Sequence, residues 1–154
     1  MNLHAERAVI GAVMLDPDAI SKVSEDLQAE MFENEVYRQT YEAAVKAYVV
    51  GDPVNLVSIA PKLHVEGYTD DDIYRELRDC VDSTVTSVEI GSYAKVLINE
   101  YKTKQLYRLM GKVKPKPDDV DKQLGELMLE LEALQKTGNH SKLKHFSEVV
   151  DEQE

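Results

Sequence analysis

Two prolines interrupt the two longest helical patterns of this chain, and they constrain its fold more than any other feature. Pro115 and Pro117 lack backbone N–H groups, and therefore no continuous helix crosses them. The pattern before them opens with a predicted capping box at Thr86–Glu89, and the pattern after them ends at Thr137–Asn139. Because both patterns repeat apolar residues at helical spacing, residues 86–138 are predicted to form a helical hairpin.

The first 85 residues carry the start and stop signals of shorter helices. Asn34 is placed to cap a helix that ends at Gly51, where a left-handed residue is wanted. Thr69 is followed by three aspartates, which favour the positive end of a helix dipole. No strand alternation competes with these patterns. The predicted fold class is therefore all-α, with a small globular helical bundle over residues 1–85 followed by the hairpin.

Other local signals predict how the short helices begin and pack. Gly11 has no side chain, so that a neighbouring helix can approach closely there. Asp16 is predicted to accept the free N–H groups of a helix with Pro17 at its first position. A further helix is predicted from about Ser58 to Val65, with Pro61 tolerated in its first turn.

Composition sets the outer bounds. The chain has 154 residues, which allow one domain with a modest core and an appended element. No apolar stretch is long enough to span a membrane, and the single cysteine, Cys80, fits a reducing cytoplasm. The net charge of -11 argues against a surface that grips nucleic acid throughout, because the phosphates would be repelled. Any DNA contact is therefore expected to be local, weak or indirect.

No arrangement of residues in the chain is typical of a catalytic centre. A phosphate loop needs two glycines, then Lys and Ser or Thr, whereas the one Gly-Lys pair, Gly111-Lys112, is followed by Val113. The four histidines are scattered, and the adjacent carboxylates of Asp70 and Asp71 are expected from helix capping. The sequence therefore predicts no catalytic residue, no metal site and no cofactor.

One face of the first hairpin helix is basic. Lys104, Arg108 and Lys112 follow one another at four-residue steps and are candidates for contact with phosphates. Two alternatives stand beside this interpretation: the stripe faces the acidic second helix of the hairpin, or it is only solvated.

The hairpin also carries more apolar side chains than two paired helices need. Such a surplus is typical of a protein interface, and it predicts a self-association surface. The alternative is that the hairpin folds back on its own globular body. The candidate interface residues are Tyr101, Leu106, Leu109, Met110, Leu124, Leu127, Met128 and Leu131.

Several short motifs, taken in order along the chain, resemble the N-terminal domain of DnaB-type replicative DNA helicases. The opening run Ala5–Ile20 resembles the start of that domain, and Tyr37–Tyr41 is similar to its His-Arg-x-Ile-Phe signature. Gly51–Ala60 is similar to its Gly-x-Pro-Ile-Asp-Leu-Val-Thr-Leu-Ala motif, and Ser92–Leu97 to the opening of its hairpin. Phe146–Val150 resembles the first turn of the linker to the motor, so that residues 139–154 are interpreted as the start of that linker. No single motif is specific for this family, but the order of the motifs along the chain is.

The resemblance implies a non-catalytic domain of an ATP-dependent helicase whose motor lies elsewhere. In these helicases, hairpins of neighbouring subunits pair antiparallel into dimers, and three dimers form a collar around DNA. The expected partners are a second copy of the chain, primase and a helicase loader. Two other hypotheses stay open at this point: a separate regulator that binds a helicase ring, and a weak single-stranded DNA-binding module that uses the basic stripe.

The chain also departs from the family pattern in its loops. The family usually has Gly-Gly before its fifth helix, where Asp70–Asp72 stand here, and a Thr-Pro turn, where Ser83–Val85 stand. The hairpin is shortened around Lys114–Pro117. These changes leave the core helices intact and affect contacts made by the loops or by the hairpin tip.

Overall fold

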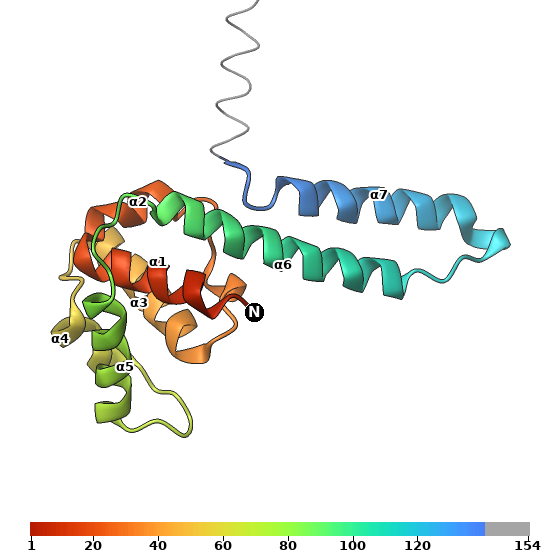
Figure 1. The fold of residues 1–154 in the computed structure, drawn as a ribbon. Helices are drawn as coiled ribbons and strands as arrows, with labels where there is room; N and C mark the ends of the chain where they lie inside the picture. The colour runs from red at the N-terminus through yellow and green to blue at the C-terminus, as the bar shows by residue number, and fades with distance from the viewer. Residues whose placement is uncertain (141–154) are drawn as a thin grey trace, which may run out of the picture. The chain divides into compact units, whose positions relative to one another are not determined.

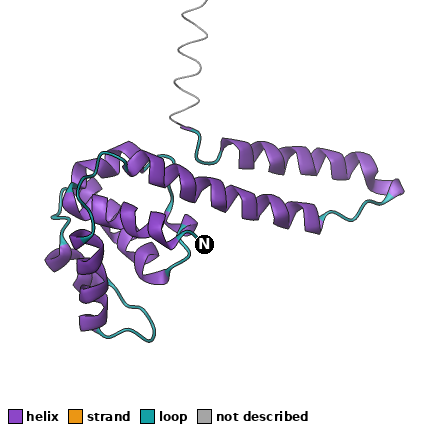
Figure 2. Cartoon of the chain, in the orientation of Figure 1, coloured by secondary structure: helices purple, strands orange, loops and turns teal. Residues whose placement is uncertain are grey.

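The computed structural model describes residues 1–140, and these residues form helices and loops without a strand, which confirms the predicted all-α fold (Figure 2). None of the described helices has the length and apolar character needed to cross a lipid bilayer. In chain order the elements, with η for 3-10 helices, are α1 (Leu3–Leu15), η1 (Pro17–Ala19), α2 (Ile20–Val23), η2 (Ala29–Met31), α3 (Glu35–Val50), α4 (Leu56–Ile59), η3 (Ala60–Lys62), α5 (Asp70–Asp82), α6 (Ile90–Lys112), η4 (Pro117–Asp119) and α7 (Val120–Lys136).

The chain divides into two compact units within α6. The first unit is Met1–Leu97, and the second begins at Ile98. The predicted division after residue 85 differs from this one, because the first two turns of α6 belong to the core of the first unit. Ile90, Ala94 and Leu97 are all buried.

Helix α1 is the central element of the first unit, and Figure 1 shows it beside α3 and α5. Its apolar side chains Val9, Ile10 and Val13 are completely buried. The partners on α3 and α5 lie at helical spacing, so that each helix presents one apolar stripe to α1. These partners are Val36, Tyr37, Tyr41 and Ala44 on α3, and Ile73, Leu77 and Cys80 on α5.

Gly11 allows α1 and α5 to approach closely, as predicted. A Cβ atom at this position would lie 1.9 Å from Thr84 Oγ1 and 2.5 Å from the carbonyl oxygen of Cys80. A hydroxyl can rotate away, but a backbone carbonyl at the end of a packed helix cannot move without shifting that helix. The distance between α1 and α5 therefore depends on the missing side chain.

A buried carboxylate connects α1 to the start of α3. The Glu6 side chain is 1% exposed. Its Oε1 accepts hydrogen bonds from the backbone N–H groups of Glu33 and Asn34, at 3.2 and 3.1 Å. Asn34 in turn caps α3 by accepting a hydrogen bond from the N–H of Tyr37. The carboxylate thus satisfies backbone donors at the helix start and fixes the position of that start on α1.

The predicted signals at both ends of α3 and at the start of α5 are confirmed. Gly51 is left-handed with φ +82°. Thr69 and Asp72 form a reciprocal capping box, in which the Asp72 N–H donates to Thr69 and the Thr69 N–H donates to Asp72. These hydrogen bonds hold the pKa of Asp72 below its usual value.

Three predictions about helix starts and bounds were wrong. In each case a tertiary contact or a tighter turn took the place of the predicted local structure. The Asp16 carboxylate does not cap the following helix; it accepts a hydrogen bond from the Ser87 hydroxyl at 3.0 Å. The predicted helix over Ser58–Val65 lies earlier, because Asn55 caps α4 and the chain is already extended at Leu63. The capping box at Thr86–Glu89 does not form, since Thr86 accepts from the N–H of Val88 and α6 begins at Ile90.

The first prediction concerns Gly11→Ala. The added methyl group overlaps a backbone carbonyl, and we expect the free energy of unfolding to fall by about 1–3 kcal/mol. Urea unfolding followed by circular dichroism measures the change. Gly91→Ala is the matched control, because Gly91 is helical and nothing lies within 4 Å of its Cβ position. A Gly11→Ala protein as stable as the Gly91→Ala protein would contradict the close approach.

The second prediction concerns Glu6→Ala. The substitution leaves the N–H groups of Glu33 and Asn34 without their acceptor, and we expect a loss of about 1–3 kcal/mol. Glu6→Gln keeps a carbonyl oxygen and is expected to lose less. Thermal unfolding of both variants measures their stabilities, and a Glu66→Ala protein, changed at an exposed glutamate, is the control. Equal stability of Glu6→Ala and Glu66→Ala would show that the carboxylate does not hold the start of α3.

Candidate functional site

The second unit is a helical hairpin built from α6, from Ile98 onward, and α7 (Figure 1). The connector is held by one side chain: Gln123 accepts from the N–H of Lys116 at 2.9 Å and donates to the carbonyl of Lys114 at 2.8 Å. At the open end, Lys102 donates to the carbonyl of Gln135 at 2.9 Å. The two helices are therefore fixed side by side at both ends.

Gly138 closes α7 and allows the chain to pass close to α6. Its φ is +74°, a left-handed conformation that favours glycine, and a Cβ atom there would lie 2.4 Å from Ile98 Cγ2. The sequence prediction that Thr137–Asn139 ends this helix is confirmed.

The seam between the two helices is only partly covered. The side chains along it are half-buried: Tyr101, Gln105 and Leu109 on α6, and Gln123, Leu127 and Leu134 on α7. No residue of α7 is buried. Pairing of the two helices therefore removes little apolar surface from water, and the hairpin contains no core of the kind found in the first unit.

A second set of apolar side chains lies on the outside of the hairpin. We name it the hairpin apolar face and define it by Leu106 (42% exposed), Met110 (66%), Leu124 (53%), Met128 (68%) and Leu131 (38%). At about 100° per residue, Leu106 and Met110 lie roughly a quarter turn or more around α6 from the seam. Leu124, Met128 and Leu131 are rotated in the same sense on α7. Because the helices are antiparallel, both groups fall on the same side of the hairpin.

The structure divides the eight predicted interface residues between these two places. Five form the hairpin apolar face, while Tyr101, Leu109 and Leu127 lie half-buried at the seam. Val113 and Val120, which were not predicted, are exposed near the tip. Helical spacing could have identified both valines from the sequence, because Val113 follows Leu106 by seven residues and Val120 precedes Leu124 by four.

The basic stripe of Lys104, Arg108 and Lys112 is exposed and is rotated to the opposite side of α6 from the hairpin apolar face. Lys112 lines a hollow of about 200 Å³ together with Glu126 and Glu130 of α7. Lys114 lines the same hollow, so that Lys112 of the stripe lies near two carboxylates of α7 and one further cation. Contact with phosphates stays a prediction.

Within residues 1–140, no group of three or more His, Cys, Asp or Glu side chains is placed to hold a metal ion. Cys80 is completely buried, and burial raises the pKa of its thiol. The candidate functional surface of the second unit is the hairpin apolar face.

A family model described as the DnaB-like helicase N terminal domain matches residues 1–99. The chain belongs to this family. The match covers the globular unit and stops within α6, so that family membership is carried by the core around α1. The matched domain is a non-catalytic region of a family whose full-length members are replicative helicases.

Known relatives agree with this assignment. The replicative DNA helicase DnaB of Nostoc sp. is 34% identical over 113 residues, which are 70% of this chain and 12% of that protein. The replicative DNA helicase DnaC of Bacillus subtilis is 26% identical over 159 residues, which cover 97% of this chain and 34% of that protein. The chain thus spans between about an eighth and a third of the length of these two relatives.

The fold of the DnaB N-terminal domain has been solved. The crystal structure of this domain from Mycobacterium tuberculosis DnaB aligns with a TM-score of 0.68 and 23% identity, over 86% of this chain and 97% of that one. The coverage extends beyond the residues of the family model, so that the likeness in fold includes part of the hairpin.

The third prediction tests the basic stripe. We expect no saturable binding of short single-stranded DNA even at low salt, because the chain has a net charge of -11 and repels the phosphates. If all three cations contact phosphates, binding would instead weaken with salt. The logarithm of the binding constant would then fall against the logarithm of the salt concentration with a slope of about -2. Fluorescence anisotropy over a salt series measures this. Binding that a K104Q/R108Q/K112Q variant abolishes would contradict our expectation.

Proposed function

We propose that this chain is an assembly and docking domain of a hexameric replicative DNA helicase. It self-associates through the hairpin apolar face, holds motor domains together in a ring, and presents its outer surface to primase or a helicase loader. The observation that carries the proposal is that α7 has no buried residue while its apolar side chains Leu124 and Met128 are more than half exposed.

A pair of helices gains most of its stability from burial of an amphipathic face, and the seam alone supplies little of it. The five residues of the hairpin apolar face lie on one side of the hairpin, and exposed apolar residues grouped in this way are typical of a protein interface. A second copy of the same hairpin offers a matching apolar face, because a two-fold contact is self-complementary by construction.

The family supports the same role. Its printed relatives are replicative DNA helicases, and this chain matches a fraction of each. The resemblance of the hairpin motifs to that family implies antiparallel dimers, three of which form a ring. In this proposal, ATP hydrolysis and unwinding belong to the whole helicase, the chain acts in the cytoplasm, and it meets DNA only weakly or through its partners.

The fourth prediction compares two neighbouring residues of α7. Met128 and Leu129 have nearly equal exposure, 68% and 69%, but only Met128 lies on the hairpin apolar face. Met128→Glu places an unpaired charge in the proposed interface, and we expect it to weaken self-association by about a hundredfold or more. Leu129→Glu is the matched control and is expected to have little effect.

Light scattering over a series of protein concentrations gives the mass of each protein, and circular dichroism shows whether the helices remain. A wild-type chain that stays monomeric at high concentration would contradict self-association. Equal effects of Met128→Glu and Leu129→Glu would contradict the assignment of the face.

A further inference from the structure

Three of the five methionines of this chain are exposed, and two of those three lie on the hairpin apolar face. Met110 and Met128 of the face are 66% and 68% exposed, and Met1, outside the face, is 68% exposed. Met14 and Met31 belong to the core of the first unit, where they are 8% and 4% exposed. The chain therefore carries two exposed thioethers on the face and a third, equally exposed, that serves as a comparison.

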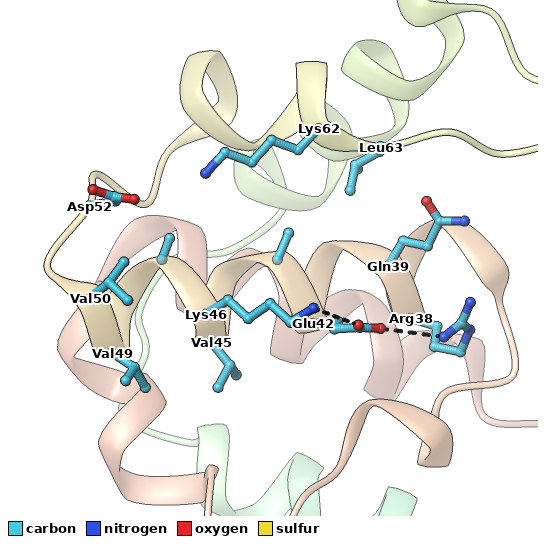
Figure 3. A pocket seen from close by; sticks show the side chains of 12 residues that line it. Arg38, Gln39, Glu42, Val45, Lys46, Val49, Val50, Asp52, Lys62 and Leu63 are labelled. Atoms are coloured by element: carbon cyan, nitrogen blue, oxygen red, sulfur yellow. Dashed lines mark hydrogen bonds and ion pairs between the residues drawn. The ribbon is translucent and has the colours of Figure 1, made fainter.

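The first unit keeps its other sulfur atoms away from solvent. Cys80 is completely buried on α5. A groove of about 800 Å³ between α3 and the segment that contains η3 has twelve lining residues, and none of these is a methionine or a cysteine (Figure 3). An oxidant that enters this groove therefore meets no thioether there. Within Met1–Leu97, all of which the structure describes, Met1 is the exposed sulfur.

Met110 and Met128 lie at about the same level along the hairpin. Leu109 and Leu127 line one hollow between the two helices, and each methionine directly follows one of these leucines. Consecutive residues of a helix are about 1.5 Å apart along its axis, and the axes of packed helices are about 8–10 Å apart. Because both methionines also belong to the same side of the hairpin, their side chains start from neighbouring points of that side.

This pair lies in the middle of the hairpin apolar face. On α7, Met128 stands about one turn from both Leu124 and Leu131. On α6, Met110 stands about one turn from Leu106. Leucines therefore flank the two thioethers toward both ends of the hairpin. The centre of an interface is where water is most completely excluded and where changes of a side chain cost the most affinity.

We propose that Met110 and Met128 are oxidation sites through which a peroxide releases the self-association of the hairpin. This role rests on the proposed pairing of hairpin apolar faces and adds a means of regulating it. Hydrogen peroxide transfers one oxygen atom to the thioether sulfur: its O–O bond breaks and an S–O bond forms. The sulfur loses two electrons, and the peroxide is reduced to water. Methionine sulfoxide reductases reverse the modification.

The sulfoxide opposes burial because it converts an apolar side chain into a polar one. Its oxygen accepts hydrogen bonds from water, and contact with leucines removes these bonds without replacing them. In a two-fold contact both copies supply Met110 and Met128, so that each oxidised methionine is present twice in one interface. The symmetry of the contact therefore doubles the effect of oxidation.

Association and oxidation exclude each other at this face. A second copy covers the thioethers of Met110 and Met128 and keeps peroxide from them, while an oxidised face associates weakly. The free chain is therefore the species that is oxidised, and its share falls as the protein concentration rises. Met1 lies outside the face, so that its oxidation does not depend on association.

The first measurement is the oxidation rate of each methionine. The 154-residue chain is treated with excess hydrogen peroxide at low and at high protein concentration, and peptide mass spectrometry measures the sulfoxide at each position. We expect oxidation of Met110 and Met128 to slow about threefold or more at the high concentration, while Met1 keeps its rate. Equal rates of the three methionines at every concentration would contradict the covering of the two.

The second measurement is the mass of the oxidised chain, taken by light scattering over a concentration series. We expect the dissociation constant to rise about tenfold or more, with the helical circular dichroism signal kept. Treatment with a sulfoxide reductase is expected to restore association. The matched control is M110L/M128L, which retains Met1 and an apolar face. Its association is compared before and after peroxide, and we expect no change.

The two proposals fail in different ways. An untreated wild-type chain that stays monomeric would contradict self-association, and the role of the oxidation sites would fall with it. A wild-type chain that associates equally well before and after complete oxidation of Met110 and Met128 would overturn only their role as oxidation sites. An equal loss of association in peroxide-treated M110L/M128L would overturn it as well, because the effect would then come from another residue.

Discussion

The contact between α1 and α5 at Gly11 is the constraint on which the globular unit depends. Helix α1 is buried against both α3 and α5, and its distance from α5 is set by a position with no side chain. Because protein interiors are close-packed, a change in that distance is passed to every side chain that both helices contact. Glu6 works on the same helix from its other side and fixes where α3 begins. Together these two residues orient the three helices of the core.

The two units are stabilised in different ways. The first unit has a continuous apolar core and satisfies its helix starts with Asn34, Asn55 and Thr69. The second has two helices, hydrogen bonds at both ends, and a half-buried seam. Such a hairpin keeps its long apolar side chains in water unless another surface covers them, which is the physical reason for our proposal of self-association.

The hairpin apolar face is a stripe of Leu and Met without a charge among its five members, which suits contact with a like surface.

The sequence alone determined the helical fold class, the hairpin, and the ends of α3 and the start of α5, since these depend on residue spacing and on caps within a few residues. It also indicated close packing at Gly11 and the surplus of apolar residues in the hairpin. Tertiary structure decided which of these residues meet. Asp16 bonds to Ser87, 71 residues away, in place of a local cap, and Tyr101, Leu109 and Leu127 turn to the seam while Leu106 and Met128 stay outside. The joining of α3 to the segment before α5 also depended on tertiary structure, because Gln39 reaches His64 across 25 residues, and spacing along a chain does not report such a contact.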